Sequence, residues 1–256
     1  PARRRVVRGA NRFGACEWEV IPLGRAKTPR QQGQEFPFEQ EYKKLVNAGN
    51  APKQAWAQLR EEFKNWLHNV EPSKDSGQAW KSISGSAFEK IVFQEFSTQV
   101  EGLGSLKVVR WKNIPKILKE PLSEKLWVRG EVRSVTVESN VDFVAYELGI
   151  GDTPRRIIAV YSCKVSLRER FQQDLFWAER LRGRGIRFCL ITLDNDNKLT
   201  KAAKTGDLSR KQVSMPTALY DRIYLFCKES EIQHYTRVFR TVDRLGEDLK
   251  RWLELD

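Results

Sequence analysis

Two residues of opposite charge stand at the ends of neighbouring apolar runs. Asp142 enters the run VDFVAY, and Lys164 ends the next run, IIAVYSCK. If these runs form a β-hairpin, the start of one strand lies beside the end of its partner, so the two side chains lie together at one sheet edge. Such a pair suits phosphodiester hydrolysis, because the carboxylate holds Mg²⁺ while the ammonium orients water or stabilises negative charge. A solvated ion pair is the structural alternative.

A charged triplet, Arg168, Glu169 and Arg170, follows Lys164 where the pattern opens a helix. Arginine can bind guanine O6 and N7 through two hydrogen bonds, and glutamate can accept a hydrogen bond from cytosine N4. The triplet therefore has the chemistry to read C·G pairs in a major groove. The alternative is a solvated helix face on which Glu169 suits the helix dipole.

These segments together resemble a known family. YSCKVSLRERFQQD, with Asp142 upstream and SGSAFEK earlier, is similar to type II restriction endonucleases of the PD-(D/E)XK superfamily. The branch is the one that cuts CCGG-containing or interrupted CC-GG sites, of the AgeI/BsaWI and EcoRII/PspGI types. The resemblance covers about residues 78–194. It implies a Mg²⁺-dependent enzyme that cuts double-stranded DNA at a short palindrome, in the cytoplasm of a prokaryotic cell and as part of restriction–modification.

The resemblance also implies roles for single residues. Asp142 becomes the central metal ligand, Lys164 the catalytic lysine, and the triplet at 168–170 the C·G-reading element. Ser162 stands two residues before Lys164, where the superfamily usually has an acidic residue. In this branch a carboxylate from the following helix takes over that role. The upstream helical glutamate of the family falls on Glu89, where it would complete the metal shell.

Two of these assignments have alternatives. Glu89 can instead close a capping box with Ser86 at a helix start, although the matching context favours the metal site. The helix carboxylate is either Asp174 or Glu179, because the positions at the usual family spacing, 177 and 178, are not acidic. Asp174 lies one turn earlier on the same helical face, and we predict that it is the ligand. Cys163 is expected to be a small buried residue whose carbonyl can bind the metal.

The composition agrees with a polyanionic partner. The 256 residues include 45 Lys and Arg against 33 Asp and Glu, a net charge of +12, which favours nucleic acid or an acidic membrane surface. The absence of an apolar stretch of membrane-spanning length predicts no transmembrane helix. Four separated cysteines and two histidines predict neither a zinc site nor a disulfide framework, and favour reduced, intracellular thiols. Most of the eight tryptophans are expected in the core, although one can serve as a DNA-stacking or wedge residue.

Residues 1–34 hold eight basic and two acidic side chains, half of the net charge. They predict an extended basic arm in which Arg3, Arg4 and Arg5 contact phosphates, with a solubilising tail as the alternative. The piece CEWEVIPL within the arm can still form a short strand. Residues 35–256 are expected to form a single domain that carries both catalysis and DNA binding. A dimer on DNA is expected, because a palindrome matches a two-fold axis.

The periodicity predicts an α/β fold with a central mixed sheet flanked by helices, as in the PD-(D/E)XK core. Helices are predicted at 39–49, 52–70, 84–104, 167–185 and 231–255, and strands in LKVVRW, KLWVRGEVRSVTV, VDFVAYEL, RRIIAVYSCKV, IRFCLITLD and RIYLFCK. A polar loop of about 25 residues is expected between the last two strands. The final helix is expected to cover the sheet, with a dimer face as the alternative. A structure-specific or repair nuclease resembling a junction resolvase, and a non-catalytic DNA-binding protein, remain the alternative functions.

Overall fold

The structure is a computed structural model that describes residues 35–128, 131–136, 141–166 and 171–255, and the account below concerns the unit Pro37–Asp256. The basic arm at 1–34, including the expected strand CEWEVIPL, lies outside the described residues. No helix in the described part of the chain combines the length and apolarity needed to cross a membrane.

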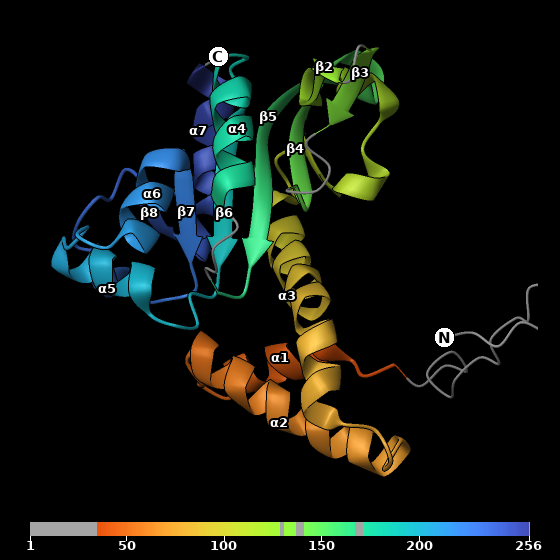
Figure 1. Cartoon of the computed structure of the whole chain (residues 1–256), viewed down its shortest axis with the longest axis vertical. Coiled ribbons are helices and arrows are strands. Elements are labelled where there is room, and N and C mark those ends of the chain that lie inside the picture. Colours follow the sequence, from red (N-terminus) through yellow and green to blue (C-terminus); the bar gives the residue numbers. More distant parts are fainter. Residues whose placement is uncertain (1–34, 129–130, 137–140, 167–170, 256) are drawn as a thin grey trace, which may run out of the picture. The chain divides into compact units, whose positions relative to one another are not determined.

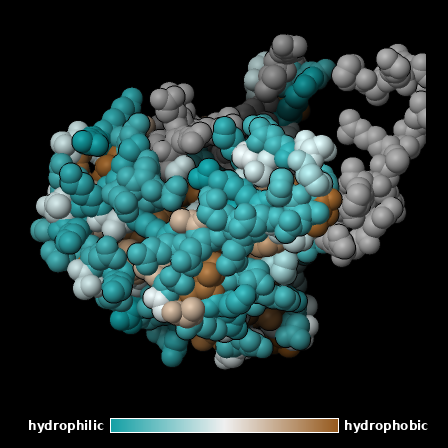
Figure 2. Space-filling model, turned by 90° about the horizontal axis from the view of Figure 1, so that it is seen from below, coloured by the Kyte–Doolittle hydropathy of each residue, from teal (hydrophilic) through white to brown (hydrophobic). Residues whose placement is uncertain are grey.

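Three helices, α1 (Phe38–Asn47), α2 (Pro52–Val70) and α3 (Ser76–Val100), open this unit (Figure 1). The apolar residues of α2 recur at helical spacing and are turned inward, so Trp56, Leu59 and Phe63 are buried. The Phe63 ring lies 5.7 Å from the ring of Trp80 in α3, which joins the two helices. Viewed from below, the surface is mostly hydrophilic, and apolar residues form small spots among polar ones (Figure 2).

Helix α3 begins earlier than predicted. It starts at Ser76, where the Asp75 side chain accepts hydrogen bonds from the backbone N–H groups of the first turn. The predicted start at residue 84 is therefore wrong. Ser86 and Glu89 lie inside the helix, and the Ser86 hydroxyl donates to the carbonyl of Ile83. The capping-box interpretation of Glu89 is also wrong, since no helix begins there.

The central sheet is mixed and has the strand order β1-β4-β5-β6-β7-β8 (Figure 1). Its strands are β1 (Leu106–Arg110), β4 (Phe143–Leu148), β5 (Pro154–Lys164), β6 (Arg187–Thr192), β7 (Arg222–Leu225) and β8 (Phe239–Thr241). Strands β1, β4 and β5 pair antiparallel, and β5 to β8 pair parallel. The predicted run KLWVRGEVRSVTV forms two strands, β2 (Ser123–Val128) and β3 (Glu131–Thr136), in a separate antiparallel pair.

Helices cover both faces of the sheet. The ring of Phe96 in α3 contacts the rings of Phe143 and Tyr161. Their neighbours in sequence, Val144 and Val160, belong instead to a core cluster with residues of α4 (Phe171–Arg182). Because successive strand residues point to opposite faces, α3 and α4 lie on opposite sides of the sheet. The sequence-based prediction of a mixed sheet flanked by helices is confirmed.

Two predictions for the C-terminal third are wrong. The expected polar loop contains two short helices, α5 (Lys198–Thr205) and α6 (Lys211–Leu219). The final helix, α7 (Leu245–Leu255), covers less than half of the predicted range, because its first part forms the short strand β8. Leu245, Leu249 and Trp252 of α7 are buried, so this helix covers the sheet, as preferred from the sequence.

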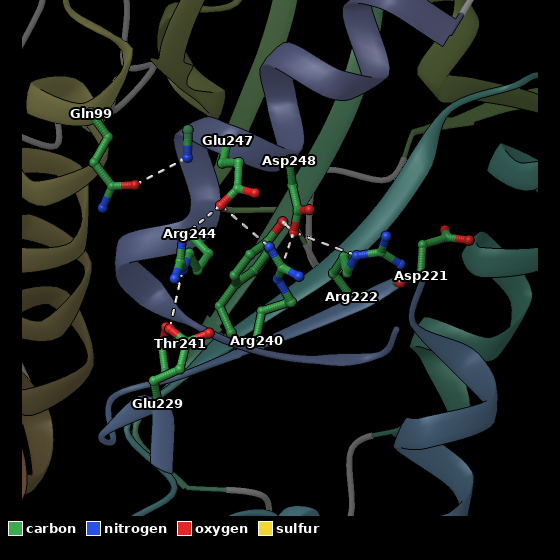
Figure 3. A network of polar contacts seen from close by, with 11 residues as sticks. Gln99, Asp221, Arg222, Glu229, Arg240, Thr241, Arg244, Glu247 and Asp248 are labelled. Carbon is green, nitrogen blue, oxygen red and sulfur yellow. Dashed lines mark hydrogen bonds and ion pairs between the residues drawn. The ribbon is translucent and has the colours of Figure 1, made fainter. Parts of the chain in front are cut away.

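A buried carboxylate fixes α7 to the parallel half of the sheet (Figure 3). Asp248 accepts a hydrogen bond of 3.0 Å from the Tyr224 hydroxyl, and its Oδ2 lies 3.4 Å from Nε of Arg222 and 3.7 Å from Nε of Arg240. Gln99 of α3 contacts the start of α7, since its Oε1 accepts a hydrogen bond from the N–H of Gly246. The buried charge is thus compensated, and α3 and α7 are held against one face together.

Candidate active site

Asp142 directly precedes β4 and is held by its backbone between two other strands. Its N–H donates to the carbonyl of Tyr161 in β5 at 2.8 Å, and its carbonyl accepts from the N–H of Trp111, next to the end of β1, at 3.0 Å. The residue is therefore placed by the pairing of three strands. A side chain whose backbone is fixed on both sides needs little reorganisation to act at one position.

The structure brings Asp142 and Lys164 together at the ends of β4 and β5. The Lys164 Nζ lies 3.6 Å from Oδ2 of Asp142, and the same oxygen accepts a hydrogen bond of 2.6 Å from the backbone N–H of Cys163. The two side chains are 38% and 20% exposed, so both can meet a ligand from solvent. Both strands are inner strands, so the pair lies at strand ends within the sheet rather than along an outer edge.

Glu89 of α3 lies in the electrostatic environment of this pair. Burial raises the pKa of its carboxyl, and the negative charge of Asp142 raises the pKa further. The positive charges of Lys164 and Arg110 act on the same group in the opposite direction. A second carboxylate is therefore close to the first, with two cations near it.

Asp174 of α4 approaches from the opposite face of the sheet. It is buried, and the hydroxyl of Tyr220 donates a hydrogen bond to its Oδ2. Burial raises the pKa of Asp174, and Asp142 raises it further, whereas the Tyr220 hydrogen bond and the charge of Lys164 lower it. The alternative ligand, Glu179, is exposed on α4. Of the two candidates, the structure places Asp174 in the surroundings of Lys164 and Asp142.

The two residues of β5 that precede Lys164 have different surroundings. Ser162 is fully buried, and its hydroxyl has no hydrogen-bond partner within the described part of the chain. Cys163 is buried, and burial raises the pKa of its thiol well above the usual value, so the sulfur stays protonated. Its backbone N–H donates the hydrogen bond to Asp142, a role that the sequence did not reveal.

Carboxylate oxygens are the donors that Mg²⁺ prefers, so the residue types fit a hard divalent cation. Among the described residues, no three His, Cys, Asp or Glu side chains lie close enough together to form a complete site. Mg²⁺ commonly uses one or two carboxylates and completes its shell with water and substrate phosphate. The arrangement therefore fits a cation whose coordination shell is completed by water and a substrate phosphate.

Two further residues at the site were missed by sequence reasoning. Arg110 ends β1, its guanidinium lies 4.8 Å from the centre of the Phe93 ring, and its buried Nε has no hydrogen-bond partner among the described residues. Tyr220 follows α6, in the segment predicted to be a loop. Neither belongs to a motif, because each meets the site only through the fold.

Arg168, Glu169 and Arg170 lie outside the described residues, and so do Arg3, Arg4 and Arg5.

Comparison with known proteins gives the family. The model of the family "BsaWI restriction endonuclease type 2" matches residues 116–250, which is more than half of the chain. A crystal structure of the specific AgeI restriction endonuclease–DNA complex is similar with a TM-score of 0.53 and 13% identity, over 97% of this chain and 99% of that one. A pre-specific BsaWI–DNA complex also matches, with a TM-score of 0.44 and 15% identity over 85% and 92% of the two chains. No curated protein matches the sequence.

The family match covers strands β2 to β8 and helices α4 to α6, and the fold is that of the restriction endonucleases. The chain therefore belongs to the BsaWI family of type II restriction endonucleases, site-specific enzymes with the PD-(D/E)XK fold.

Proposed function

We propose that this enzyme hydrolyses phosphodiester bonds of double-stranded DNA at a short palindrome with a C·G core of the CCGG type, in a Mg²⁺-dependent reaction. The observation that carries the proposal is the contact between Lys164 and Asp142, with two further carboxylates in the same electrostatic environment. Family membership supports the reaction type. The similar AgeI structure is a complex with DNA, which supports the substrate.

Asp142 and Asp174 would hold the cation, with Glu89 binding through water. A divalent cation bound there neutralises phosphate charge and lowers the pKa of water. Asp174 supplies the negative charge that Ser162 does not carry, and Tyr220 restrains it through Oδ2. The hydrogen bond from the Cys163 N–H fixes Oδ2 of Asp142 in the same way. The carboxylates of Asp142 and Asp174 are thus each oriented by one hydrogen-bond donor of the chain, which reduces the reorganisation needed for ligand binding.

Lys164 acts on the phosphate or on the attacking water. Its ammonium group contacts Asp142 and is partly exposed, so it can stabilise the charge that develops on the phosphate oxygens or orient a water molecule. Arg110 is a second cation at the same site, and we propose that it contacts a phosphate oxygen beside the one that is cut. Its stacking on Phe93 restrains the guanidinium for this contact.

Sequence reading is proposed for Arg168, Glu169 and Arg170, which come just after β5 and before α4. Arginine and glutamate at this place have the hydrogen-bonding groups that distinguish a C·G pair in the major groove. Two copies of the chain would bind one palindrome, each acting on one strand, because the two-fold axis of the DNA then matches that of a homodimer.

The test compares purified wild-type protein with Lys164→Ala and Asp142→Ala. We expect wild-type protein with Mg²⁺ to cut a plasmid into discrete bands, and both variants to lose several orders of magnitude in single-turnover cleavage. In gel shifts with Ca²⁺, Lys164→Ala should keep its specific binding, since the base-reading residues remain.

Two outcomes would contradict the proposal. Preferential cutting of branched DNA without sequence preference would indicate a structure-specific nuclease, and tight binding without metal-dependent cleavage would indicate a DNA-binding protein. Sequencing the ends of the digested DNA gives the site and the stagger together.

A further inference from the structure

The β2–β3 hairpin exposes a tryptophan. Trp127 is 73% exposed, whereas the other tryptophans in the described part of the chain are buried or half-buried. Its partner in the register is Val132, which is 60% exposed. Exposing two large apolar side chains side by side is unfavourable in water, so this pair is a candidate contact surface.

One face of the hairpin combines apolar, basic and hydroxyl side chains, without an acidic one among its described residues. Trp127 pairs with Val132 and Lys125 pairs with Ser134, and because directly opposite and alternate residues share a face, these four lie together. All four are exposed. The acidic residues of the hairpin, Glu124 and Glu131, fall on the other face by the same alternation. We call the first set, Lys125, Trp127, Val132 and Ser134, the tryptophan face.

The base of the hairpin is fixed to the body of the unit. Arg184 follows α4, and its guanidinium donates to the carbonyls of Pro121 and Ser123 at 2.7 and 2.9 Å and to the carboxylate of Glu124 at 2.7 Å. A two-stranded hairpin alone is only marginally stable in water, so this anchor matters for its position. The anchor engages the acidic face and leaves the tryptophan face exposed.

We propose that the tryptophan face contacts duplex DNA that flanks the recognition site, an inference that rests on the proposed function. Tryptophan and valine suit the sugar edges and base steps of a minor groove, while lysine and serine suit phosphate oxygens. The face carries no carboxylate that would repel DNA. The segment just before the hairpin adds exposed Lys112 and Lys116.

A second copy of the chain is a poorer match for this face. Two apolar side chains expose at most about 250 Å² each, whereas a stable protein interface buries about 800 Å² per partner. A single aromatic side chain with basic and hydroxyl neighbours is instead sufficient for a contact with nucleic acid.

The sheet register gives the place of this contact. Arg187, three residues after the anchor Arg184, is level with Ala159, whereas Lys164 is level with Thr192. Five residues of strand correspond to about 17 Å, and one base pair of B-DNA to about 3.4 Å. The hairpin base is therefore displaced from the catalytic lysine by about 17 Å along the strands, a length equal to about five base pairs. The contact would fall on DNA that flanks the site rather than on the recognised bases.

The experiment measures the affinity of Trp127→Ala by gel shift in Ca²⁺, on a duplex with long flanks and on one trimmed close to the cleavage site. We expect a loss of about tenfold on the long duplex and no loss on the trimmed one. Trp127→Tyr should recover most of the affinity. Ile150→Ala, which removes an apolar side chain that is 99% exposed elsewhere, is the matched control and should change neither value.

A second variant tests the charge. Lys125→Ala should lower the slope of log affinity against log salt by about one on the long duplex only. Unchanged melting temperatures of all variants would show that the fold is kept, as expected for exposed side chains.

Three results would overturn the inference while leaving the proposed function intact. The first two are an unchanged affinity of Trp127→Ala on the long duplex and an equal loss of affinity on both duplexes. The third is a difference in sedimentation between Trp127→Ala and wild type without DNA, which would identify a second copy of the chain as the partner. A wild-type protein that neither binds nor cuts DNA with Mg²⁺ would overturn the proposed function itself.

Discussion

The pKa of Glu89 is raised by burial and by the charge of Asp142, so its ionised form costs folding free energy. The direction of the change in stability with pH follows from the difference in this pKa between the folded and the unfolded chain. Below the usual pKa of a glutamate the group is protonated in the folded and the unfolded chain, and the cost is absent. As pH rises above that value the unfolded chain ionises more readily than the folded one, so stability falls.

Replacing Glu89 by Gln should therefore raise the melting temperature of the metal-free protein at pH 7–8 and leave it nearly unchanged near pH 4. Cleavage should fall at least tenfold, because a proposed metal ligand is lost. Thermal melts at both pH values and single-turnover cleavage measure the two effects. Glu95→Gln, an exposed change on the same helix, is the control. A lower melting temperature at pH 8 for Glu89→Gln would show that its carboxylate stabilises the fold.

Asp174 and Glu179 give a direct comparison on one helix. Asp174→Asn should reduce cleavage by at least a hundredfold, because it removes a proposed ligand charge, whereas Glu179→Gln should keep the wild-type rate. Tyr220→Phe removes the hydrogen bond to Asp174 and should raise the Mg²⁺ concentration needed for half-maximal cleavage. Cleavage as a function of Mg²⁺ separates this effect from a general loss of stability. Equal activity of Asp174→Asn and wild type would remove Asp174 from the site.

The raised pKa values of Glu89 and Asp174 also predict a pH dependence of cleavage. Glu89 and Asp174 both bind a proton more readily than ordinary carboxyl groups, and only their ionised forms bind a cation. We expect cleavage to fall on the acid side at a pH above the usual carboxyl range, and added Mg²⁺ to shift the fall to lower pH. A rate profile measured at two Mg²⁺ concentrations checks both statements.

The sequence predicted that Asp142 and Lys164 lie close together, but not which residues from other elements surround them. Asp142 and Lys164 were found because hairpin geometry relates the start of one strand to the end of the next. Asp174 was preferred over Glu179 from the 100° rotation per residue of a helix. Tyr220 and Arg110 are brought to the site by long-range packing, which no local spacing records.

At the scale of elements, α7 depends on one buried charge. Asp248→Ala would leave two guanidinium groups, those of Arg222 and Arg240, without their buried partner, and should cost about 3–5 kcal/mol of unfolding free energy. Glu247→Ala, next to it but exposed, should cost less than 1 kcal/mol. Urea unfolding of the two variants provides the measurement. Similar midpoints for both would show that the network contributes little.

Which elements the sequence predicted depends on their length and surroundings. Strands β4, β5 and β6 were predicted because strands buried on both faces appear as continuous apolar runs. Helices α5 and α6 were missed since each is short and has a helix breaker, Gly206 directly after α5 and Pro216 inside α6. The last helix was predicted too long because Val238 and Val242 fit its spacing, while β8 has only three residues, too few for the alternation of a strand to be recognised in the sequence.

At the scale of the whole molecule, half of the net charge falls in residues 1–34, outside the described residues. If this arm contacts phosphates, its deletion should weaken binding to all DNA sequences alike and lower the salt slope by about one per lost contact. Affinity for cognate and unrelated duplexes at several salt concentrations measures this. Full affinity and an unchanged slope after deletion would make the arm a solubilising tail.

The lengths of the outer strands of the central sheet affect the tendency of the protein to aggregate at high concentration. An exposed sheet edge presents unpaired N–H and C=O groups that can recruit strands from other chains. Here one outer strand, β8, has three residues, and the other, β1, has five and carries Lys107 and Arg110. Neither offers a long apolar template, so intermolecular sheet growth, the first step toward amyloid-like aggregates, has little to start from at either side.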